Sequence, residues 1–461
     1  MALAEGDRKV EQGSAADTAS VEALFDLAAA KQRSGDLEGA RRAYVRVLDL
    51  EPFHHDALNN LGVILRAEGK NLAALAAHER ALNLKPNDPG LLANLGNILR
   101  SLGRFNEALN VLHRAVSLAP KVPAVHHNLG LVLRDLGHND DALACFERSL
   151  ALWPNNRRVK LDRAVTLLAK GDYRAGFRAL EARFEPQGPE REGLPPIWSG
   201  ESLGTRSLLI EAEQSVGDTL QFIRFATQVK GPRVVLNCPT ELCRLLGTAP
   251  GIDATLPFGE PPEGFDLRVP LLSLPRVLGT TLSSMPRRVP YLRPPIGAGF
   301  ALTHPRTAKL AVGIVWTETN EEADAAPEAI GLERFFPLLS RADVAYYSLQ
   351  TGARSSDLEM LGAPGLVHDL GPLLSTIDDL ARVIEQLDLV VTVNSAVAHL
   401  AGALGRPVWL VLPARADWRW ALEPERSPWY PTLRLFRQPK PGDWAGAFAG
   451  VARKLHALVA G

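Results

Sequence analysis

NLGVILRAEGKNLAALAAHERALNLKPNDPGLLANLGNILRSLG, residues 60–103, decides the fold of the N-terminal part of this chain because its opening Asn-Leu-Gly returns 34 residues later. A series of glycines and a series of prolines keep the same interval, and these two markers are independent of each other. The glycines are Gly35, Gly69, Gly103, Gly137 and Gly171, and the prolines are Pro52, Pro86, Pro120 and Pro154. A constant period of this kind indicates stacked helical hairpins.

Small residues recur at fixed places inside each repeat, including Ala40, Ala74, Ala108 and Ala142. Small side chains let two antiparallel helices approach closely, the recurring glycine turns the chain, and the proline ends the second helix. These features resemble the tetratricopeptide repeat family. We therefore expect residues 24–184 to form a superhelix with an extended concave surface. The resemblance implies that this surface binds a protein or peptide.

Asn60, Asn94 and Asn128 share one position of the repeat, immediately before the Leu-Gly pair of the first helix. A carboxamide can both donate to and accept from the backbone of an extended peptide. One interpretation is therefore a ladder that holds an unfolded segment. The alternative is that these asparagines only bridge neighbouring helices or face water.

Composition restricts the partners and the compartment. The 461 residues, 46% of them hydrophobic, suggest roughly three folding units at about 150 residues each. Lysine plus arginine (51) nearly balances aspartate plus glutamate (52), so no overall field attracts nucleic acid or an anionic membrane. We expect no nucleic-acid partner and no stable membrane insertion.

The N-terminus and the cysteines indicate a cytoplasmic protein. Residues 1–23 are polar and lack the apolar core of a signal peptide, so we expect them to be disordered. The three cysteines form no metal-ligand pattern and are interpreted as reduced thiols.

Beyond the repeats, residues 185–205 are dense in proline and glycine and form the predicted linker. Short β-rich runs then alternate with helical stretches, which predicts two parallel-sheet α/β domains over 206–297 and 308–461. The predicted strands are 206–213, 233–238 and 265–270 in the first domain, and 309–316, 344–350, 387–393 and 406–412 in the second. Ligands of such sheets bind beyond the carboxyl ends of strands, and a cleft between two domains is a natural site.

Two strand-to-helix junctions carry the candidate chemistry. In EAEQSVGDTLQFIRFA, residues 211–226, Gly217 permits a tight turn and Asp218 and Thr219 open a helix. In the second junction, a strand runs into Asn394 and Ser395 before a helix begins near Ala396. Free N–H groups and the positive end of a helix dipole make such a start an anion site. The alternative for Asp218 and for Ser395 is a helix cap.

Six segments together show a resemblance that covers nearly the whole chain from 24 to 461. They are EQSVGDTLQFIRFA (213–226), LLSLPRVLGTT (271–281), VPYLRP (289–294), AVAHLAGALGRPVWLVLP (396–413), DWRW (417–420) and SPWYPTLRLFRQ (427–438). They resemble segments of bacterial tetratricopeptide-repeat glycosyltransferases, whose catalytic half is similar to the heptosyltransferases. The resemblance implies a two-domain GT-B fold, a nucleotide-sugar donor held mainly by the C-terminal domain, and neither a metal ion nor another cofactor.

Matched position by position, the resemblance assigns roles to residues of both junctions. Asp218 is the expected general base on the acceptor hydroxyl. The expected donor site, which holds the diphosphate, comprises Gly217, Thr219, Asn394, Ser395, Ala396 and His399. The chain has no DxD motif, the metal-and-diphosphate signature of the other major transferase fold, which agrees with this implied fold. It also has no P-loop and no GxGxxG motif, which argues against a kinase, an ATPase and a nicotinamide enzyme.

Three departures from the family pattern stand at or near these positions. Ser215 replaces a usual glycine, Asn394 replaces an aspartate, and the acidic segment 317–333 replaces a basic one. A diphosphate leaving group normally has a cationic partner, with about 1.5 to 3 kcal/mol for each charged hydrogen bond. The candidates to supply it are Arg224, Arg415 and Arg419.

The aromatic residues Trp418, Trp420, Trp429 and Tyr430 are interpreted as core or cleft-wall residues, with base stacking as the alternative. If residues 418–420 formed a strand, the two tryptophans would share one face.

These observations lead to one leading hypothesis and two alternatives. The first is an inverting glycosyltransferase that moves a sugar from a nucleotide sugar to a hydroxyl of a protein held by the repeats, and flagellin is a known type of acceptor in the resembling family. The second is a catalytically degenerate relative that serves as a protein-binding scaffold. The third is a transferase that acts on lipopolysaccharide.

Overall fold

The computed structural model describes residues 21–185, 193–213, 215–297, 301–303, 305–317 and 330–460. Three of the sequence predictions fall wholly or partly outside these residues: 1–20 of the N-terminal segment, 186–192 of the linker and 318–329 of the acidic segment. The chain divides into two compact units, Met1–Val159 and Lys160–Gly461, each of which is considered by itself.

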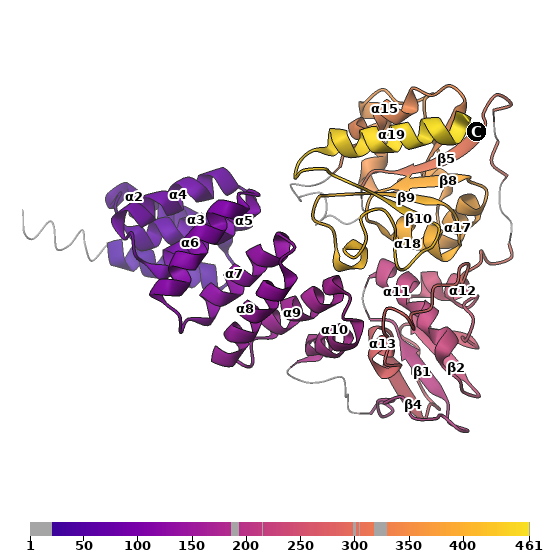
Figure 1. The fold of residues 1–461 in the computed structure, drawn as a ribbon, viewed down its shortest axis with the longest axis horizontal. Coiled ribbons are helices and arrows are strands. Elements are labelled where there is room, and N and C mark those ends of the chain that lie inside the picture. The colour runs from indigo at the N-terminus through magenta and orange to yellow at the C-terminus, as the bar shows by residue number, and fades with distance from the viewer. Residues whose placement is uncertain are drawn as a thin grey trace, which may run out of the picture. The chain divides into compact units, whose positions relative to one another are not determined.

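The first unit consists of the predicted helical hairpins, and the repeat prediction is confirmed (Figure 1). Its helices are one over 21–33, α2 (Leu37–Leu50), α3 (His55–Ala67), α4 (Asn71–Leu84), α5 (Pro89–Ser101), α6 (Phe105–Leu118), α7 (Pro123–Asp135) and α8 (Asn139–Leu152). The next helix, α9 (Arg157–Lys170), runs across the division between the two units, and α10 (Tyr173–Ala179) lies in the second.

The recurring glycines fulfil the turning role that the period predicted. Gly69 and Gly103 have φ angles of 74° and 72°, a left-handed conformation that side chains other than glycine adopt at a cost. After the first of these turns, Lys70 N–H donates to the carbonyl of Leu65 at 2.8 Å and closes the end of α3. The small residues act as expected too, because a Cβ on Gly96 would lie 2.5 Å from Leu112 Cγ on the facing helix.

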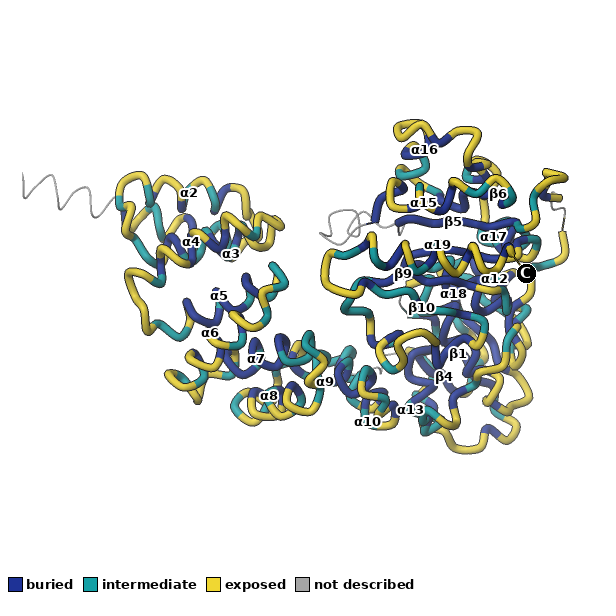
Figure 2. Tube along the Cα trace, turned by 45° about the horizontal axis from the view of Figure 1, so that its top comes forward, coloured by how far each residue is buried: buried dark blue, intermediate teal, exposed yellow. Residues whose placement is uncertain are grey.

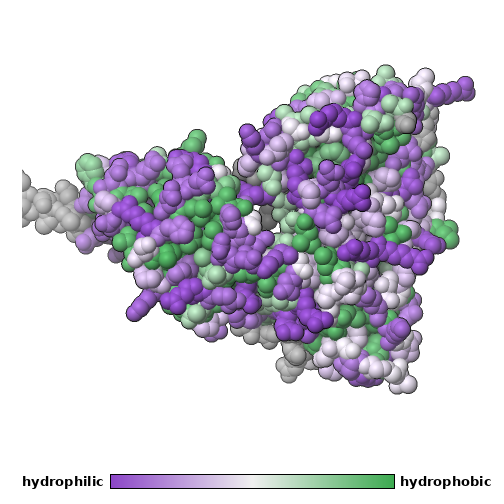
Figure 3. All heavy atoms as spheres, in the orientation of Figure 1, coloured by the Kyte–Doolittle hydropathy of each residue, from purple (hydrophilic) through white to green (hydrophobic). Residues whose placement is uncertain are grey.

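The surface of the repeats is mixed, with hydrophobic and hydrophilic atoms interspersed (Figure 3). Leu50, Leu84 and Leu118, the last residues of α2, α4 and α6, are all exposed. Their common position repeats the 34-residue period on the outside of the stack.

The second unit contains two parallel sheets, as the alternation of strands and helices predicted. The first sheet has the order β3-β2-β1-β4 and the second has the order β10-β9-β8-β5-β6-β7. The strands are β1 (Leu208–Glu211), β2 (Val234–Cys238), β3 (Ala254–Pro257), β4 (Leu267–Pro270), β5 (Leu310–Val315), β6 (Val344–Ser348), β7 (His368–Asp369), β8 (Leu389–Thr392), β9 (Val408–Leu412) and β10 (Leu433–Arg437). The two sheets are consistent with two Rossmann-like domains after the repeats, which is the predicted fold class.

Every strand predicted from the sequence forms, and three further strands, β3, β7 and β10, lie outside the predicted set. β7 has two exposed residues, and β3 contains no fully buried one. β10 is an edge strand in which Arg434 and Arg437 are only partly buried, so its sequence lacks the apolar run of a central strand.

The helices that cover the sheets are mostly short. The α-helices are α11 (Val216–Phe222), α12 (Cys243–Leu246), α13 (Leu274–Val277), α15 (Phe336–Leu339), α16 (Asp357–Met360), α17 (Ile377–Glu385), α18 (Ala396–Ala403) and α19 (Trp444–Ala460). The 3₁₀ turns are η1 (Leu180–Phe184), η2 (Ile223–Gln228), η3 (Thr240–Leu242), η4 (Leu271–Ser273), η5 (Leu332–Phe335), η6 (Ala353–Ser356), η7 (Gly371–Leu373) and η8 (Trp418–Trp420). Residues 418–420 form a 3₁₀ turn and no strand, so the shared face that a strand would give Trp418 and Trp420 does not arise.

The core of the second unit continues from one sheet into the other. Leu208 and Leu209 of β1 and Val390 of β8 are fully buried, and central strands such as β5 are dark blue in Figure 2. One hydrophobic cluster includes β1, β8 and the aromatic residues Tyr173 and Phe177 of α10. The two strand-to-helix junctions of interest are therefore anchored in a common core.

Candidate functional site

The two predicted junctions lie against each other. A Cβ on Gly217, in the first turn of α11, would lie 3.1 Å from His399 Cδ2 and 3.8 Å from the Cα of Ala396 on α18. Glycine at 217 therefore permits a close approach of the two helix starts. Asp218, which follows Gly217, therefore lies close to the start of α18, the segment that the sequence analysis assigned to the donor diphosphate.

Ser215 begins α11 and orients Asp218. Its hydroxyl oxygen accepts the Asp218 N–H at 3.2 Å and its O–H donates to Asp218 Oδ2 at 3.0 Å. Ser215 is thus the cap of this helix, a role open to Asp218 from the sequence alone. A glycine at 215, the residue usual in the resembling family, could make neither bond.

Arg419 faces Asp218 from the C-terminal domain. Its Nη2 donates to Asp218 Oδ1, its Nε donates to Gln221 Oε1 at 2.6 Å, and its Nη1 donates to Asp417 Oδ1 at 2.9 Å. The Asp218 and Arg419 side chains are only 13% and 15% exposed. Burial opposes the charge of Arg419, but Asp417 and Asp218 outweigh it and raise the pKa of the guanidinium.

Gln221 is a member of this cluster that received no role from the sequence, although it stands in the quoted segment 213–226. Its position one helical turn after Asp218 on α11 places both side chains on one face, and that spacing is the signal that could have revealed it.

His399 is buried beside this cluster. Its Nδ1 lies 2.9 Å from the hydroxyl of Tyr430, and its ring stacks on Trp420 with a centroid distance of 5.5 Å. Burial, together with Arg419 and Arg224, holds the pKa of His399 well below its ordinary value, so the ring is neutral near pH 7. Burial also raises the pKa of Tyr430, which keeps its proton.

Asn394 and Ser395 have partners of their own. Trp420 Nε1 donates to Asn394 Oδ1 at 2.9 Å, and the hydroxyls of Ser395 and Thr392 lie 3.0 Å apart. Ser395 precedes α18 as its N-cap residue but makes no side-chain capping bond. Ser395 thus occupies the cap position without a side-chain capping bond, so its hydroxyl does not compete for the N–H groups at the α18 start.

Arg224 is buried where the two Rossmann-like domains pack together, and its guanidinium donates hydrogen bonds there. It is 1% exposed, its Nη1 donates to the Trp429 carbonyl at 2.5 Å, and its Nη2 donates to Tyr291 Oη at 2.8 Å. Trp429 and Tyr430 are fully buried, as the interpretation of these aromatics as core residues predicted. Arg419, one of the cations considered from the sequence, lies beside Asp218.

The asparagines of the repeats all donate to a preceding helix. Asn60 Nδ2 donates to Tyr44 Oη at 3.0 Å, Asn94 Nδ2 to Asn59 Oδ1 at 2.8 Å, and Asn128 Nδ2 to the Ala93 carbonyl at 3.4 Å. These bonds are the ones that the helix-bridging interpretation expects. Peptide binding by Asn60, Asn94 and Asn128 stays a prediction, and it requires a peptide to exchange with these contacts.

The comparisons with known proteins concern the repeats first. Family profiles described as tetratricopeptide repeat match residues 89–155 in one case and residues 25–89 and 127–192 in another. Together these matches assign tetratricopeptide repeats to residues 25–192. Protein FlbA of Caulobacter vibrioides is 28% identical to this chain, in an alignment that covers 66% of the chain and 55% of FlbA. The chain thus spans about half the length of this curated relative.

Two solved structures are similar to part of this chain. The structure titled for Pseudomonas aeruginosa PilF has a TM-score of 0.33 and 26% identity, and it covers 36% of this chain and 77% of its own. YrrB, titled a TPR protein with an unusual peptide-binding site, has a TM-score of 0.30 and 23% identity, and it covers 37% of this chain and 92% of its own.

The described residues contain neither a cluster of metal-ligating side chains nor a helix that could span a membrane. Nowhere among them do three or more His, Cys, Asp or Glu side chains gather in a way that could hold a metal ion. Among the helices of the same residues, none has the length and apolar character needed to cross a membrane.

Proposed function

We propose that this protein is a glycosyltransferase that moves a sugar from a nucleotide sugar to a hydroxyl of a protein acceptor bound by the repeats. The observation that carries the proposal is the meeting of Asp218 and Arg419 beside the start of α18. A base, a cation and a helix N-terminus in one place are the groups that a transfer from a diphosphate requires.

Asp218 would act as the base for the acceptor. Its carboxylate takes the proton of the acceptor hydroxyl while the oxygen attacks the anomeric carbon of the donor. The bond from that carbon to the diphosphate oxygen breaks in the same step, and the nucleoside diphosphate leaves with the electron pair. A single displacement of this kind inverts the anomeric configuration.

Arg419 would stabilise the leaving diphosphate and release Asp218 at the same time. In the structure it donates to Asp218, Asp417 and Gln221. A diphosphate at the α18 start would attract the guanidinium away from the Asp218 carboxylate, which then becomes available as a base. Donor binding would thus prepare the base.

His399 would donate to the diphosphate from Nε2. The ring is neutral, and Tyr430 keeps its proton and can donate it to Nδ1. That hydrogen bond fixes the tautomer with the proton on Nε2. A neutral N–H donor in a buried site stabilises negative charge as it develops on the leaving group.

The repeats would supply the acceptor. Tetratricopeptide repeats expose an extended surface suited to a polypeptide, and their fusion to a nucleotide-sugar enzyme is explained if the polypeptide is the substrate. Flagellin, a known acceptor of the resembling glycosyltransferases, is the first candidate.

The test is a transfer assay on the full chain with a panel of nucleotide sugars and purified flagellin, read by intact-protein mass. We expect a mass increment of one sugar residue, and a loss of about 10² to 10⁴ in rate for Asp218→Asn. Glu385→Gln is the matched control, because Glu385 is an exposed carboxylate at the end of α17, outside the cluster. Equal rates for Asp218→Asn and Glu385→Gln would remove Asp218 from the mechanism.

A scaffold without catalysis is the second candidate, and one observation favours it. Both oxygens of Asp218 are engaged, Oδ1 by Arg419 and Oδ2 by Ser215. Calorimetry with UDP, GDP, CMP and ADP distinguishes the candidates. Micromolar binding that Arg419→Ala weakens supports the transferase, because that residue lies outside every other pocket described. If none of the four binds in a way that depends on Arg419, the scaffold is supported.

A further inference from the structure

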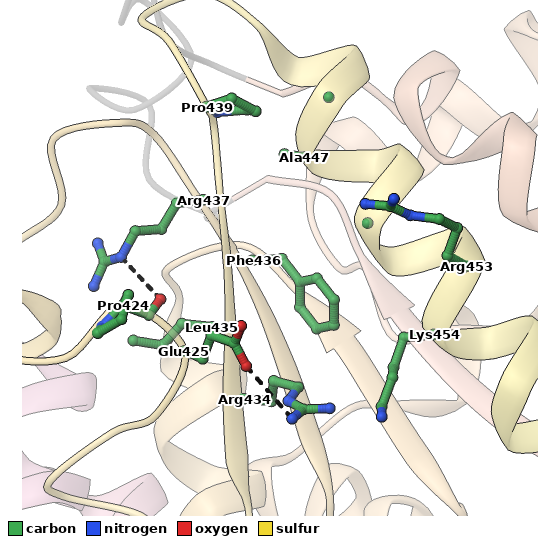
Figure 4. Close-up of a pocket in the computed structure, with 12 residues that line it drawn as sticks. Pro424, Glu425, Arg434, Leu435, Phe436, Arg437, Pro439, Ala447, Arg453 and Lys454 are labelled. Atoms are coloured by element: carbon green, nitrogen blue, oxygen red, sulfur yellow. Dashed lines mark hydrogen bonds and ion pairs between the residues drawn. The ribbon is translucent and has the colours of Figure 1, made fainter.

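A separate cavity of about 540 Å³ lies between the edge strand β10 and the C-terminal helix α19. Its walls include Arg434 and Phe436 of β10 and Gly446, Gly450, Arg453 and Lys454 of α19 (Figure 4). We refer to it as the β10–α19 groove. None of the residues proposed above for the transfer reaction lines it.

The groove is strongly cationic although the chain as a whole carries a net charge of −1. Four basic side chains line it and Glu425 is the one acidic residue in the lining. Arg437 donates to the Pro424 carbonyl at 3.3 Å and points away from Phe436 in Figure 4. Arg434 is held by Glu425 at 3.6 Å.

Arg453 and Lys454 are the available cations. Both are exposed, and within the described part of the chain no hydrogen bond or ion pair joins either of them to another residue. They are adjacent on α19, and Figure 4 shows their side chains on the far side of Phe436 from Arg437. An anion that enters the groove therefore meets positive charge without breaking an existing pair.

Gly450 opens the groove above Phe436. Glycine is unfavourable in a helix interior, and Gly450 lies within the 17-residue helix α19 without a positive φ angle. A Cβ at this position would meet only Phe436 Cδ1, at an ordinary contact distance of 3.5 Å. Packing therefore does not require glycine here, and the consequence of its missing side chain is space over the aromatic ring.

We propose that the β10–α19 groove binds a nucleotide, with its phosphate on Arg453 and Lys454 and its base against Phe436. The volume falls in the range of small-molecule sites, which is roughly 300 to 1,000 Å³. Phe436 is half-buried, which leaves part of its ring for stacking. An acidic peptide would use the cations but has no use for the aromatic ring, so the nucleotide fits the lining better.

The experiment is isothermal titration of the full chain with AMP. We expect Arg453→Glu/Lys454→Glu to weaken AMP binding by at least about tenfold, as the loss of two charged partners predicts. The matched control is Lys230→Glu/Arg288→Glu, which makes the same charge change at two exposed cations outside the groove. Equal affinities of these two double variants would overturn the proposal.

Gly450→Leu tests the shape of the groove independently of charge. Because its Cβ has room and leucine favours helix, the variant should keep or raise the melting temperature while its side chain fills the space over Phe436. We expect at least a tenfold loss of AMP affinity. Unchanged AMP affinity in this variant would refute a site at the groove.

Two further titrants decide what is recognised. Pyrophosphate should bind more weakly than AMP if the base stacks on Phe436, and equal or tighter binding would overturn the stacking. A hexaglutamate peptide that binds more tightly than AMP would assign the groove to acidic polypeptides and overturn the nucleotide proposal.

Discussion

The ion pair between Asp218 and Arg419 leads us to predict opposite changes in nucleoside diphosphate affinity when either partner is replaced. Asp218→Asn should tighten the binding of a nucleoside diphosphate, whereas Arg419→Ala should weaken it. In the structure the carboxylate competes with any diphosphate for the guanidinium, since Arg419 Nη2 donates to Asp218 Oδ1. In the Asp218→Asn variant, the neutral asparagine side chain replaces one charged partner of Arg419, while Asp417 and Gln221 stay in place.

The magnitude follows from the burial of the pair. The two side chains are 13% and 15% exposed, so their interaction exceeds the about 0.2 to 1 kcal/mol of an exposed pair. Hydrogen bonds to charged groups contribute about 1.5 to 3 kcal/mol. Because Asp417 keeps part of the guanidinium occupied, we take the lower end, about 1.5 kcal/mol, which corresponds to roughly tenfold tighter binding for Asp218→Asn.

A double-mutant cycle measures this interaction directly. The free energy of unfolding in urea is determined for the wild type, Asp218→Asn, Arg419→Ala and the double variant, and diphosphate affinity is measured by calorimetry on the same four proteins. We expect a coupling energy of about 1.5 to 3 kcal/mol. A coupling below about 0.5 kcal/mol, or weaker diphosphate binding by Asp218→Asn, would refute the competition between the carboxylate and the donor.

Two more predictions concern stability. The pKa of His399 is lowered in the folded protein, so the unfolded chain binds the proton first and stability falls as pH drops below the unfolded value of about 6.5. Unfolding in urea at pH 6.5 and at pH 5 should show a loss of up to about 2 kcal/mol that His399→Gln reduces, and an unchanged difference in that variant would contradict the assignment. At Gly69, where φ is 74°, alanine should cost about 1 kcal/mol, whereas alanine at Gly450 should stabilise by a similar amount. Melting temperatures that move in the same direction for both alanine variants would contradict this pair of predictions.

The repeats could be predicted from the sequence because the same residue types recur at the same positions every 34 residues. Gly69 and Gly103 occupy identical left-handed turns, so the 34-residue period marks the local backbone directly. The central strands were readable for a similar reason, since strands buried on both faces need continuous apolar runs. β10 was not predicted as a strand because it lies at the edge of the sheet, where a strand needs no continuous apolar run and can contain arginines.

Only some residues of the candidate site could be predicted from the sequence. Asp218 and the start of α18 each carry a local pattern of strand, turn and helix, so both were found from the sequence. The partnership of Asp218 with Arg419 joins residues separated by 201 positions, and no local pattern predicts it. The groove between β10 and α19 likewise depends on two elements whose pairing is set by the packing of the sheet.

The fold also bears on where this protein can be cut or recombined. The sequence suggested a boundary after residue 184, yet Tyr173 of α10 stacks on Trp429 at 5.6 Å and Phe177 lies 6.1 Å from Trp418. A fragment that starts at the linker would lack Tyr173 and Phe177, and the tryptophans that they contact in the C-terminal domain would be more exposed. An engineered exchange of the recognition arm should therefore keep this chain from Lys160 onward, so that a new array of helices ends on the native α10.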